Sequence, residues 1–366
     1  MRLFVQASSG GFAAPAWPAT AVDRVAAVAE RAGAEAIIAG WGLATDYTAL
    51  IDRVRRDGRR VYLWLPVFSE YGPSAHPARD QSGRAHRGAV SDAGDDFRFA
   101  CPSQTANIDL VLSQFDRHFA AQGFDGVMLD KIRFSSFGNG FAAGLGCLCR
   151  RCRRYYAERG VDIPGLIARL EEADKPWLTP AARHGFRYDF ADRLIDDFYR
   201  ARARLITEAV ATIVGYLRTK HLSVGLDVFA PALADLVGQD LAELAGLADF
   251  IKPMTYRVTD APAGIPYELA QLKTELAANG CPIGSRLEEL WAVEDLAGPA
   301  GYAAQLDLLA GLDCPVLPGV EVNRLPFCAT SPAYVEASLA AIEQAGLAGA
   351  VLSWNVLAEV VYPAFN

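Results

Sequence analysis

The chain has no apolar run long enough to cross a membrane, and its N-terminus lacks the apolar segment and small-residue cleavage site of a signal peptide. We therefore expect a cytoplasmic protein with no membrane partner. Positive charge is also scarce: the formal net charge is −8, whereas a nucleic-acid surface requires a basic patch. None of the five histidines occurs in an H-x-x-x-H spacing, so no catalytic metal is predicted.

What the chain does have is a regular alternation of apolar, strand-like segments with helical patterns. Strands are predicted at 2–6, 35–40, 60–67, 125–130, 222–228, 248–254, 314–320 and 348–354. Helices are predicted at 21–32, 47–56, 107–122, 188–219, 233–247, 266–278, 299–310 and 332–345. Eight strands with intervening helices predict an α/β protein with a single (β/α)8 TIM-barrel domain over 1–366. A doubly wound sheet is the alternative, but no Gly-x-Gly-x-x-Gly follows the first strand, and we expect no organic cofactor.

The length exceeds that of an ordinary barrel, so we expect insertions after strands 3, 4 and 6. Residues 68–104 form a long, polar loop with Gly and Pro after strand 3. Residues 135–187 follow strand 4 and contain a cysteine cluster, and two shorter segments, 255–265 and 281–298, follow strand 6. Such long loops are usually functional or disordered.

The segment from Phe124 to Phe134 is typical of a buried strand that ends in a carboxylate, Asp130. An Asp at the carboxyl end of a parallel strand lies where α/β barrels place their chemistry. The structural alternative is that Asp130 caps a following helix or pairs with Lys131 or Arg133. The strand alone does not decide between these two interpretations.

The sharpest motif is a cluster of cysteines, Cys147, Cys149 and Cys152, spaced C-x-C-x2-C. Three thiols within six residues reach one tetrahedral ion, and Cys101, at the end of the loop after strand 3, is the candidate fourth ligand. In a reducing compartment such a cluster predicts metal binding before disulfides. We therefore expect one structural zinc rather than free thiols on an exposed loop.

These four cysteines resemble the zinc site of family 42 β-galactosidases, which also joins the loop after strand 3 to the loop after strand 4. The strand that ends at Asp130 is similar to strand 4 of several sugar-cleaving barrels. The segment 250–256, which ends Met-Thr-Tyr, is similar to their strand 6. The resemblance implies a glycoside-hydrolase-like barrel with a carbohydrate substrate.

The sequence also departs from each named family. Family 42 enzymes end strand 4 with Asn-Glu, where this chain has Leu129-Asp130. Family 18 chitinases end it with Asp-x-Asp-x-Glu, and Met128, Asp130 and Ile132 stand at the matching positions. Chitinase-type acid catalysis is therefore not expected, and no single family is assigned.

Glycoside hydrolysis needs two carboxyl groups that flank the scissile bond. Three lie at predicted strand ends in apolar surroundings: Asp130, Asp227 and Glu321. In many sugar-cleaving barrels strand 4 supplies the acid/base and strand 7 the nucleophile, which by resemblance gives these roles to Asp130 and Glu321. We expect Asp227 to orient a hydroxyl, or to replace Glu321 if that side chain points away.

Other side chains at or beyond the strand ends are expected to bind the sugar through ring faces, hydrogen bonds and charge. They are Trp64, Arg133, Lys252, Tyr256, Arg324, Trp354 and Asn355. Lys252 also gives a second enzyme hypothesis, because Schiff-base aldolases carry their lysine near the end of strand 6. A carbohydrate-binding barrel without catalysis is the third hypothesis. The oligomeric state, including a homo-oligomer, stays open.

Overall fold

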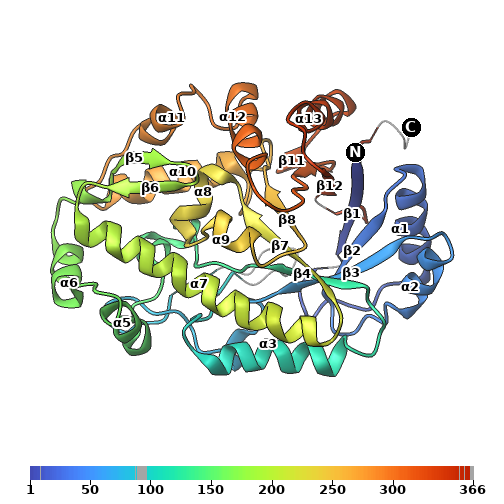
Figure 1. Ribbon diagram of the computed structural model, residues 1–366, viewed down its shortest axis with the longest axis horizontal. Coiled ribbons are helices and arrows are strands. Elements are labelled where there is room, and N and C mark those ends of the chain that lie inside the picture. The colour runs from blue at the N-terminus through green and yellow to red at the C-terminus, as the bar shows by residue number, and fades with distance from the viewer. Residues whose placement is uncertain (9, 87, 89–96, 354, 358, 363–366) are drawn as a thin grey trace.

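The computed structural model describes residues 1–366 except 9, 87, 89–96, 354, 358 and 363–366. Its centre is an eight-stranded parallel sheet curled into a barrel, with helices around the outside (Figure 1). The strands are β1 (Arg2–Ser8), β2 (Ala36–Gly40), β3 (Arg60–Pro66), β4 (Gly126–Asp130), β7 (Ser223–Phe229), β8 (Phe250–Met254), β9 (Gly319–Glu321) and β12 (Gly349–Ser353). All eight overlap the predicted strands, although β9 begins five residues later than predicted, so the TIM-barrel prediction is confirmed.

The barrel closes between β8 and β9, which are the two ends of the hydrogen-bonded strand order. The junction consists of a parallel bridge between Ile251 and Val316, just before β9 begins. Ile251 N–H donates to Pro315 O at 3.0 Å, and Leu317 N–H donates to Ile251 O at 2.9 Å. This junction is shorter than its neighbours, since β7 and β8 pair over five residues.

Helices follow the strands and pack their apolar faces on the outside of the barrel. The main ones are α1 (Ala19–Arg31), α2 (Thr48–Arg55), α3 (Thr105–His118), α7 (Arg193–Thr219), α10 (Ile265–Ala278), α12 (Pro299–Leu309) and α13 (Pro332–Gln344). No helix in the described part of the chain is both long and apolar enough to span a membrane.

Two of the predicted helices differ from the observed ones. The helix expected at 188–219 begins only at Arg193, because Asp192 caps it through Leu194 N–H and the preceding residues form a hairpin. The helix expected at 233–247 is broken, because Gly238 adopts a left-handed φ of 81°. It splits into α8 (Pro231–Ala234) and α9 (Leu241–Ala245).

The long segment between β4 and α7 contains several short elements. They are α4 (Phe141–Gly144), α5 (Arg150–Ala157), α6 (Ile163–Glu171), β5 (Pro180–His184) and β6 (Arg187–Phe190). Further small elements lie nearer the C-terminus: α11 (Arg286–Leu290), β10 (Arg324–Leu325) and β11 (Cys328–Ala329). The first group places the cysteine cluster beside the loop that follows β3.

The barrel interior is filled by side chains. Phe4, Tyr62 and Phe250 pack against one another with ring centroids 5.4–5.8 Å apart. Gly225 makes room for this cluster, since a Cβ there would stand 2.1 Å from the Phe250 ring. This aromatic cluster fills the middle of the barrel, so side chains that could take part in polar chemistry are confined to the carboxyl ends of the strands.

Candidate active site and cysteine cluster

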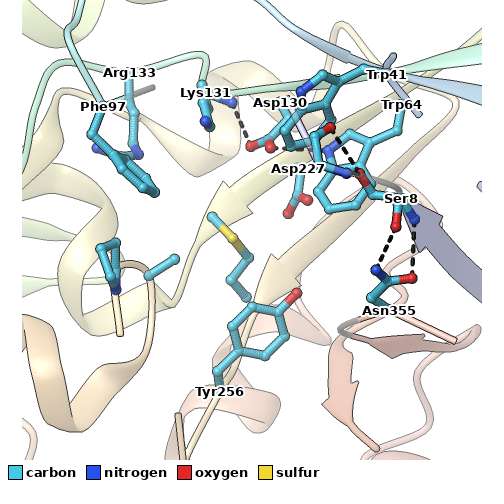
Figure 2. Close-up of a pocket in the computed structure, with 14 residues that line it drawn as sticks. Ser8, Trp41, Trp64, Phe97, Asp130, Lys131, Arg133, Asp227, Tyr256 and Asn355 are labelled. Carbon is cyan, nitrogen blue, oxygen red and sulfur yellow. Dashed lines mark hydrogen bonds between the residues drawn. The ribbon is translucent and has the colours of Figure 1, made fainter. Parts of the chain in front are cut away.

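A pocket of about 710 Å³, including its open mouth, lies at the carboxyl ends of the barrel strands (Figure 2). Strands β1, β3, β4, β7 and β8 each contribute at least one side chain, and the loops after β1, β2, β3, β4, β8 and β12 complete the wall. The lining residues are Ser8, Gly10, Trp41, Trp64, Phe97, Asp130, Lys131, Arg133, Asp227, Met254, Tyr256, Pro262, Ala263 and Asn355.

Asp130 and Asp227 occupy equivalent positions on adjacent strands. The register pairs Leu129 of β4 with Leu226 of β7, so the next residue on each strand is an aspartate. Parallel neighbours are about 4.8 Å apart, and the two aspartates share the inward face with Met128 and Gly225. The fold therefore brings two carboxyl groups to one side of the same pocket.

Both oxygens of Asp130 accept hydrogen bonds. Trp64 Nε1 donates to Oδ2 at 2.9 Å, and the backbone N–H of Lys131 donates to Oδ1 at 2.5 Å. Trp64 is itself braced edge-on by Trp41, with ring centroids 4.4 Å apart. The carboxylate is thus held in one orientation at the pocket wall, beside an aromatic surface.

Asp227 lies in a drier environment. Lys252 Nζ donates to Asp227 Oδ2 at 2.9 Å and to the Tyr256 hydroxyl at 2.5 Å. Burial raises the pKa of Asp227 to about 7; the Lys252 ammonium opposes this rise and Asp130 adds to it. Asp227 Oδ1 is buried and has no hydrogen-bond partner among the described residues. The carboxyl therefore has one anchored oxygen and one free oxygen, and it titrates close to neutrality.

Lys252 is not part of the pocket surface. Its side chain is fully buried beneath Asp227 and Tyr256. Burial lowers its pKa, but the Asp227 carboxylate and the Tyr256 hydroxyl outweigh burial and raise the pKa above the ordinary lysine value. Lys252 is therefore an ammonium ion that supports the pocket from below, rather than a residue placed to touch a ligand.

A second ion pair, between Lys131 and Glu70, lies at another wall of the pocket. Lys131 Nζ donates to Glu70 Oε1, and both side chains are buried. The ammonium also lies over the rings of Phe97 (4.5 Å) and Trp41 (5.2 Å). Lys131 and Glu70 both have left-handed backbones, with φ of 54° and 78°. Such strained conformations cluster at functional sites.

Arg133 and Asn355 were predicted to bind substrate, and both line the pocket. The central carbon of the Arg133 guanidinium lies 4.6 Å from the ring centroid of Phe99 and 4.1 Å from that of Phe229. Asn355 is fixed by Ser8: its Oδ1 accepts from the Ser8 N–H at 3.1 Å, and its Nδ2 donates to the Ser8 carbonyl. Of the remaining predicted binding residues, Trp64 and Tyr256 are also in the wall.

Glu321 does not reach this pocket, so the expected pairing across the barrel mouth with Asp130 is not formed. Its side chain is fully buried, and Oε1 accepts from Val258 N–H, Thr259 N–H and the Thr259 hydroxyl at 2.8–3.0 Å. Oε2 accepts from the Tyr334 hydroxyl. Hydrogen bonds from neighbouring backbone N–H and hydroxyl groups therefore saturate the carboxylate that was expected to contact a sugar.

One other predicted binding residue, Arg324, is not brought to the pocket. Arg324 lies on β10, is half-exposed and pairs with Glu359 at 3.2 Å. Trp354 lies outside the described residues. Three residues that line the pocket were not predicted from the sequence: Ser8, Trp41 and Phe97. The only sequence signal for them is their position just after predicted strands or in the long loop after strand 3.

The four predicted cysteines come together. Their Sγ atoms all lie within 4.8 Å of one another, and all four residues are buried. Cys101 Sγ is 3.4 Å from Cys152 Sγ and 3.6 Å from Cys149 Sγ. A tetrahedral ion with metal–sulfur bonds of about 2.3 Å needs sulfur–sulfur distances of about 3.8 Å, so the site is completed when the shorter distances lengthen slightly and the longer ones contract.

Backbone N–H groups point at the sulfur atoms. Arg79 N–H lies 3.3 Å from Cys147 Sγ, and Cys152 N–H lies 3.5 Å from Cys149 Sγ, which suits thiolates. The same region fastens two loops together, since Leu148 N–H donates to Arg79 O at 2.7 Å. The loop after β3, which supplies Glu70 and Phe97 to the pocket region, is thus tied to the insertion after β4.

Neither the comparison with protein families nor the one with curated proteins finds a match for this chain. Solved structures do match. The glycoside hydrolase domain of PgaB (BpsB) from Bordetella bronchiseptica is 12% identical with a TM-score of 0.59, over 97% of this chain and 94% of that domain. The spore cortex-lytic enzyme SleL from Bacillus megaterium QM B1551 is 8% identical with a TM-score of 0.51, over 99% of this chain and 72% of that one. At such low identity the likeness establishes the barrel fold alone, while the resemblance to the family 42 zinc site stays a prediction.

Proposed function

We propose that this protein hydrolyses O-glycosidic bonds, with Asp227 as the general acid and Asp130 as the base or nucleophile. The observation that carries the proposal is the pair of carboxyl groups on adjacent strands in one aromatic-walled pocket. Glycoside hydrolysis requires two carboxyls in different protonation states. The fold likeness to the glycoside hydrolase domain of PgaB and to SleL supports this class of reaction.

The two environments favour different roles. Asp227 is desolvated, its pKa is raised to about 7, and its Oδ1 is unoccupied, so it holds a proton near neutral pH that it can pass to a leaving-group oxygen. Asp130 accepts two N–H hydrogen bonds and is rigidly aimed, which suits a carboxylate that attacks or activates water. This assignment moves the acid from the strand-4 residue, as the family resemblance implied, to the next strand.

The aromatic side chains support a sugar as the ligand. Trp64, Trp41 and Phe97 present ring surfaces to the pocket, which match the apolar faces of pyranoses. Asn355 and Ser8 supply neutral hydrogen-bonding groups beside them. The lining contains two cations and two carboxyls, and each cation lies near an acidic group, so a neutral glycan is the substrate class that we propose.

The Schiff-base hypothesis is less well supported. A lysine nucleophile must be a neutral amine that reaches the substrate. Lys252 is instead buried under the pocket, with a raised pKa and hydrogen bonds to two acidic groups. A binding barrel without catalysis is distinguished from the hydrolase by turnover alone.

We also propose that Cys101, Cys147, Cys149 and Cys152 hold one structural zinc ion. Four buried sulfurs within 4.8 Å, with N–H groups directed at two of them, fit a tetrahedral thiolate site. When bound, the ion would cross-link the loop after β3 to the insertion after β4. The cysteines would thereby keep the loop that carries Phe97 in place at the pocket.

The test is a panel of nitrophenyl glycosides, assayed with wild type, D227N, D130N and E321Q. Loss of either working carboxyl is expected to lower kcat by about a hundred- to ten-thousandfold. E321Q should keep turnover within about tenfold of wild type and lower only Tm, since Glu321 bonds backbone rather than pocket. Retained turnover in D227N with loss in E321Q would restore the strand-4 and strand-7 pair. Sugar binding without any turnover by wild type would favour the binding barrel.

A further inference from the structure

Arg202, in the middle of α7, is a fully buried arginine. Its Nη2 donates to the carbonyl oxygens of Gly144 and Leu236, both at 3.1 Å. Its Nε and Nη1 have no hydrogen-bond partner among the described residues, and it forms no ion pair with any of them. A buried guanidinium is costly unless a negative group balances its charge.

Aromatic rings surround much of the guanidinium. Tyr199, Phe134 and Phe198 have ring centroids 4.5, 5.3 and 5.6 Å from its central carbon. Such contacts partly stabilise a cation, but each is worth only about 0.5–2 kcal/mol. The aromatic cage therefore does not replace a full counter-charge.

Asp235 is one candidate for the negative group that balances the charge of Arg202. It lies close enough for Arg202 to lower its pKa, yet burial dominates and raises the pKa to about 6. Its Oδ2 accepts instead from Tyr188 N–H at 2.9 Å, and Arg200 and Arg187 act on it more strongly than Arg202 does. Asp235 is thus shared among three arginines and contacts none of them within ion-pair distance.

The other neighbour is the cysteine cluster. Arg202 bonds Gly144, and a Cβ at Gly146 would stand 3.0 Å from Arg202 Nε, so the guanidinium lies against the turn that leads directly into Cys147. Tyr156, one helical turn after Cys152, is buried with its hydroxyl unpartnered among the described residues. A single residue of chain, Gly146, thus separates Cys147 from the backbone that the Arg202 guanidinium faces.

We propose that Arg202 is the buried counter-charge of a metal-bound four-thiolate centre, an inference that rests on the metal binding proposed above. Four thiolates around a divalent cation carry a net charge of −2. The exposed arginines nearby, Arg150, Arg151 and Arg154, are screened by water and salt, whereas Arg202 acts through the protein interior. Arg202 is therefore a positioning residue for the metal centre and strengthens metal binding without touching the metal.

The experiment measures zinc affinity by chelator competition, and Tm with and without zinc, for wild type and R202M. We expect R202M to bind one zinc at least tenfold more weakly, and its Tm to rise less on zinc addition than that of wild type. A purely structural role would lower Tm equally in the zinc-free and zinc-loaded proteins and leave the zinc Kd unchanged. Cobalt substitution gives an independent readout, because the thiolate-to-cobalt absorption bands report cobalt binding directly, and the cobalt Kd of R202M should be raised over that of wild type as the zinc Kd is.

Matched variants separate charge from packing. R202K keeps the charge and should stay within about threefold of wild type, and R151A, an exposed change at the same cluster, should do the same. D235N should leave zinc affinity intact. If R202M does not fold, R202Q retains donors for Gly144 and Leu236 without the charge and serves the same test. A zinc Kd in R202M or R202Q within threefold of wild type overturns the proposal, whereas absence of zinc from wild type would overturn the metal site itself.

Discussion

Replacing Lys252 with methionine removes the ammonium group that lies 2.9 Å from Asp227 Oδ2. At an effective dielectric constant of about 20, that attraction is worth roughly 6 kcal/mol, which corresponds to roughly four pKa units. Water entry and relaxation will absorb part of it, so we expect the pKa of Asp227 to rise by at least about one unit. The wild-type pKa is about 7, and a general acid works only while protonated, so wild-type activity should fall as pH rises through 7.

In K252M the alkaline limb of the kcat/KM profile should therefore move to higher pH by one unit or more. The assay is the pH dependence of hydrolysis of whichever glycoside wild type turns over, between pH 4 and 10. K131M is the matched control, because Lys131 pairs with Glu70 rather than with Asp227, and its limb should stay in place. A limb that stays fixed in K252M, or moves to lower pH, would refute the assignment of Asp227 as the acid.

Two further outcomes are expected. W64F removes the N–H donor to Asp130 Oδ2 and should lower kcat/KM by about ten- to a hundredfold with little change in Tm. The reason is that a hydrogen bond to a charged group is worth about 1.5–3 kcal/mol. Unchanged kinetics would mean that Trp64 contributes packing only. C101S should lose stoichiometric zinc by elemental analysis and expose the loop 68–104 to limited proteolysis, as chelation of wild type should; full zinc content in C101S would contradict the four-cysteine site.

The barrel was predictable because its signal is repeated along the chain. Each strand is a short apolar run, and β4 is buried along its whole length, as parallel strands covered on both faces must be. The cysteine cluster was predictable because three of its members are local, at 147, 149 and 152, and because strands 3 and 4 are neighbours in a barrel. The placement of Asp130 and Asp227 followed from strand ends alone.

What the sequence did not contain was the direction of individual side chains. Glu321 ends a strand just as Asp130 does, but the N–H groups of Val258 and Thr259 lie beside its carboxylate and bind it. Glu70 lies in a long loop with no periodic pattern, so its pairing with Lys131 depends on a backbone turn that sequence does not specify. Side-chain partners of this kind are set by tertiary contacts between segments far apart in the chain.

The hydrogen bonds of Glu321 bear on the stability of the barrel, because they lie beside the short junction that closes it. β8 and β9 meet mainly through the bridge at Ile251 and Val316, so local opening of the barrel should begin there, and amide hydrogen exchange at Leu317 should be faster than in β4. Glu321 stands just above this junction and holds the segment after β8 to the end of β9. A carboxylate at a barrel rim can thus stabilise strand closure, and here the hydrogen bonds of Glu321 hold β8 and β9 together below the pocket, where the barrel has its shortest strand pairing.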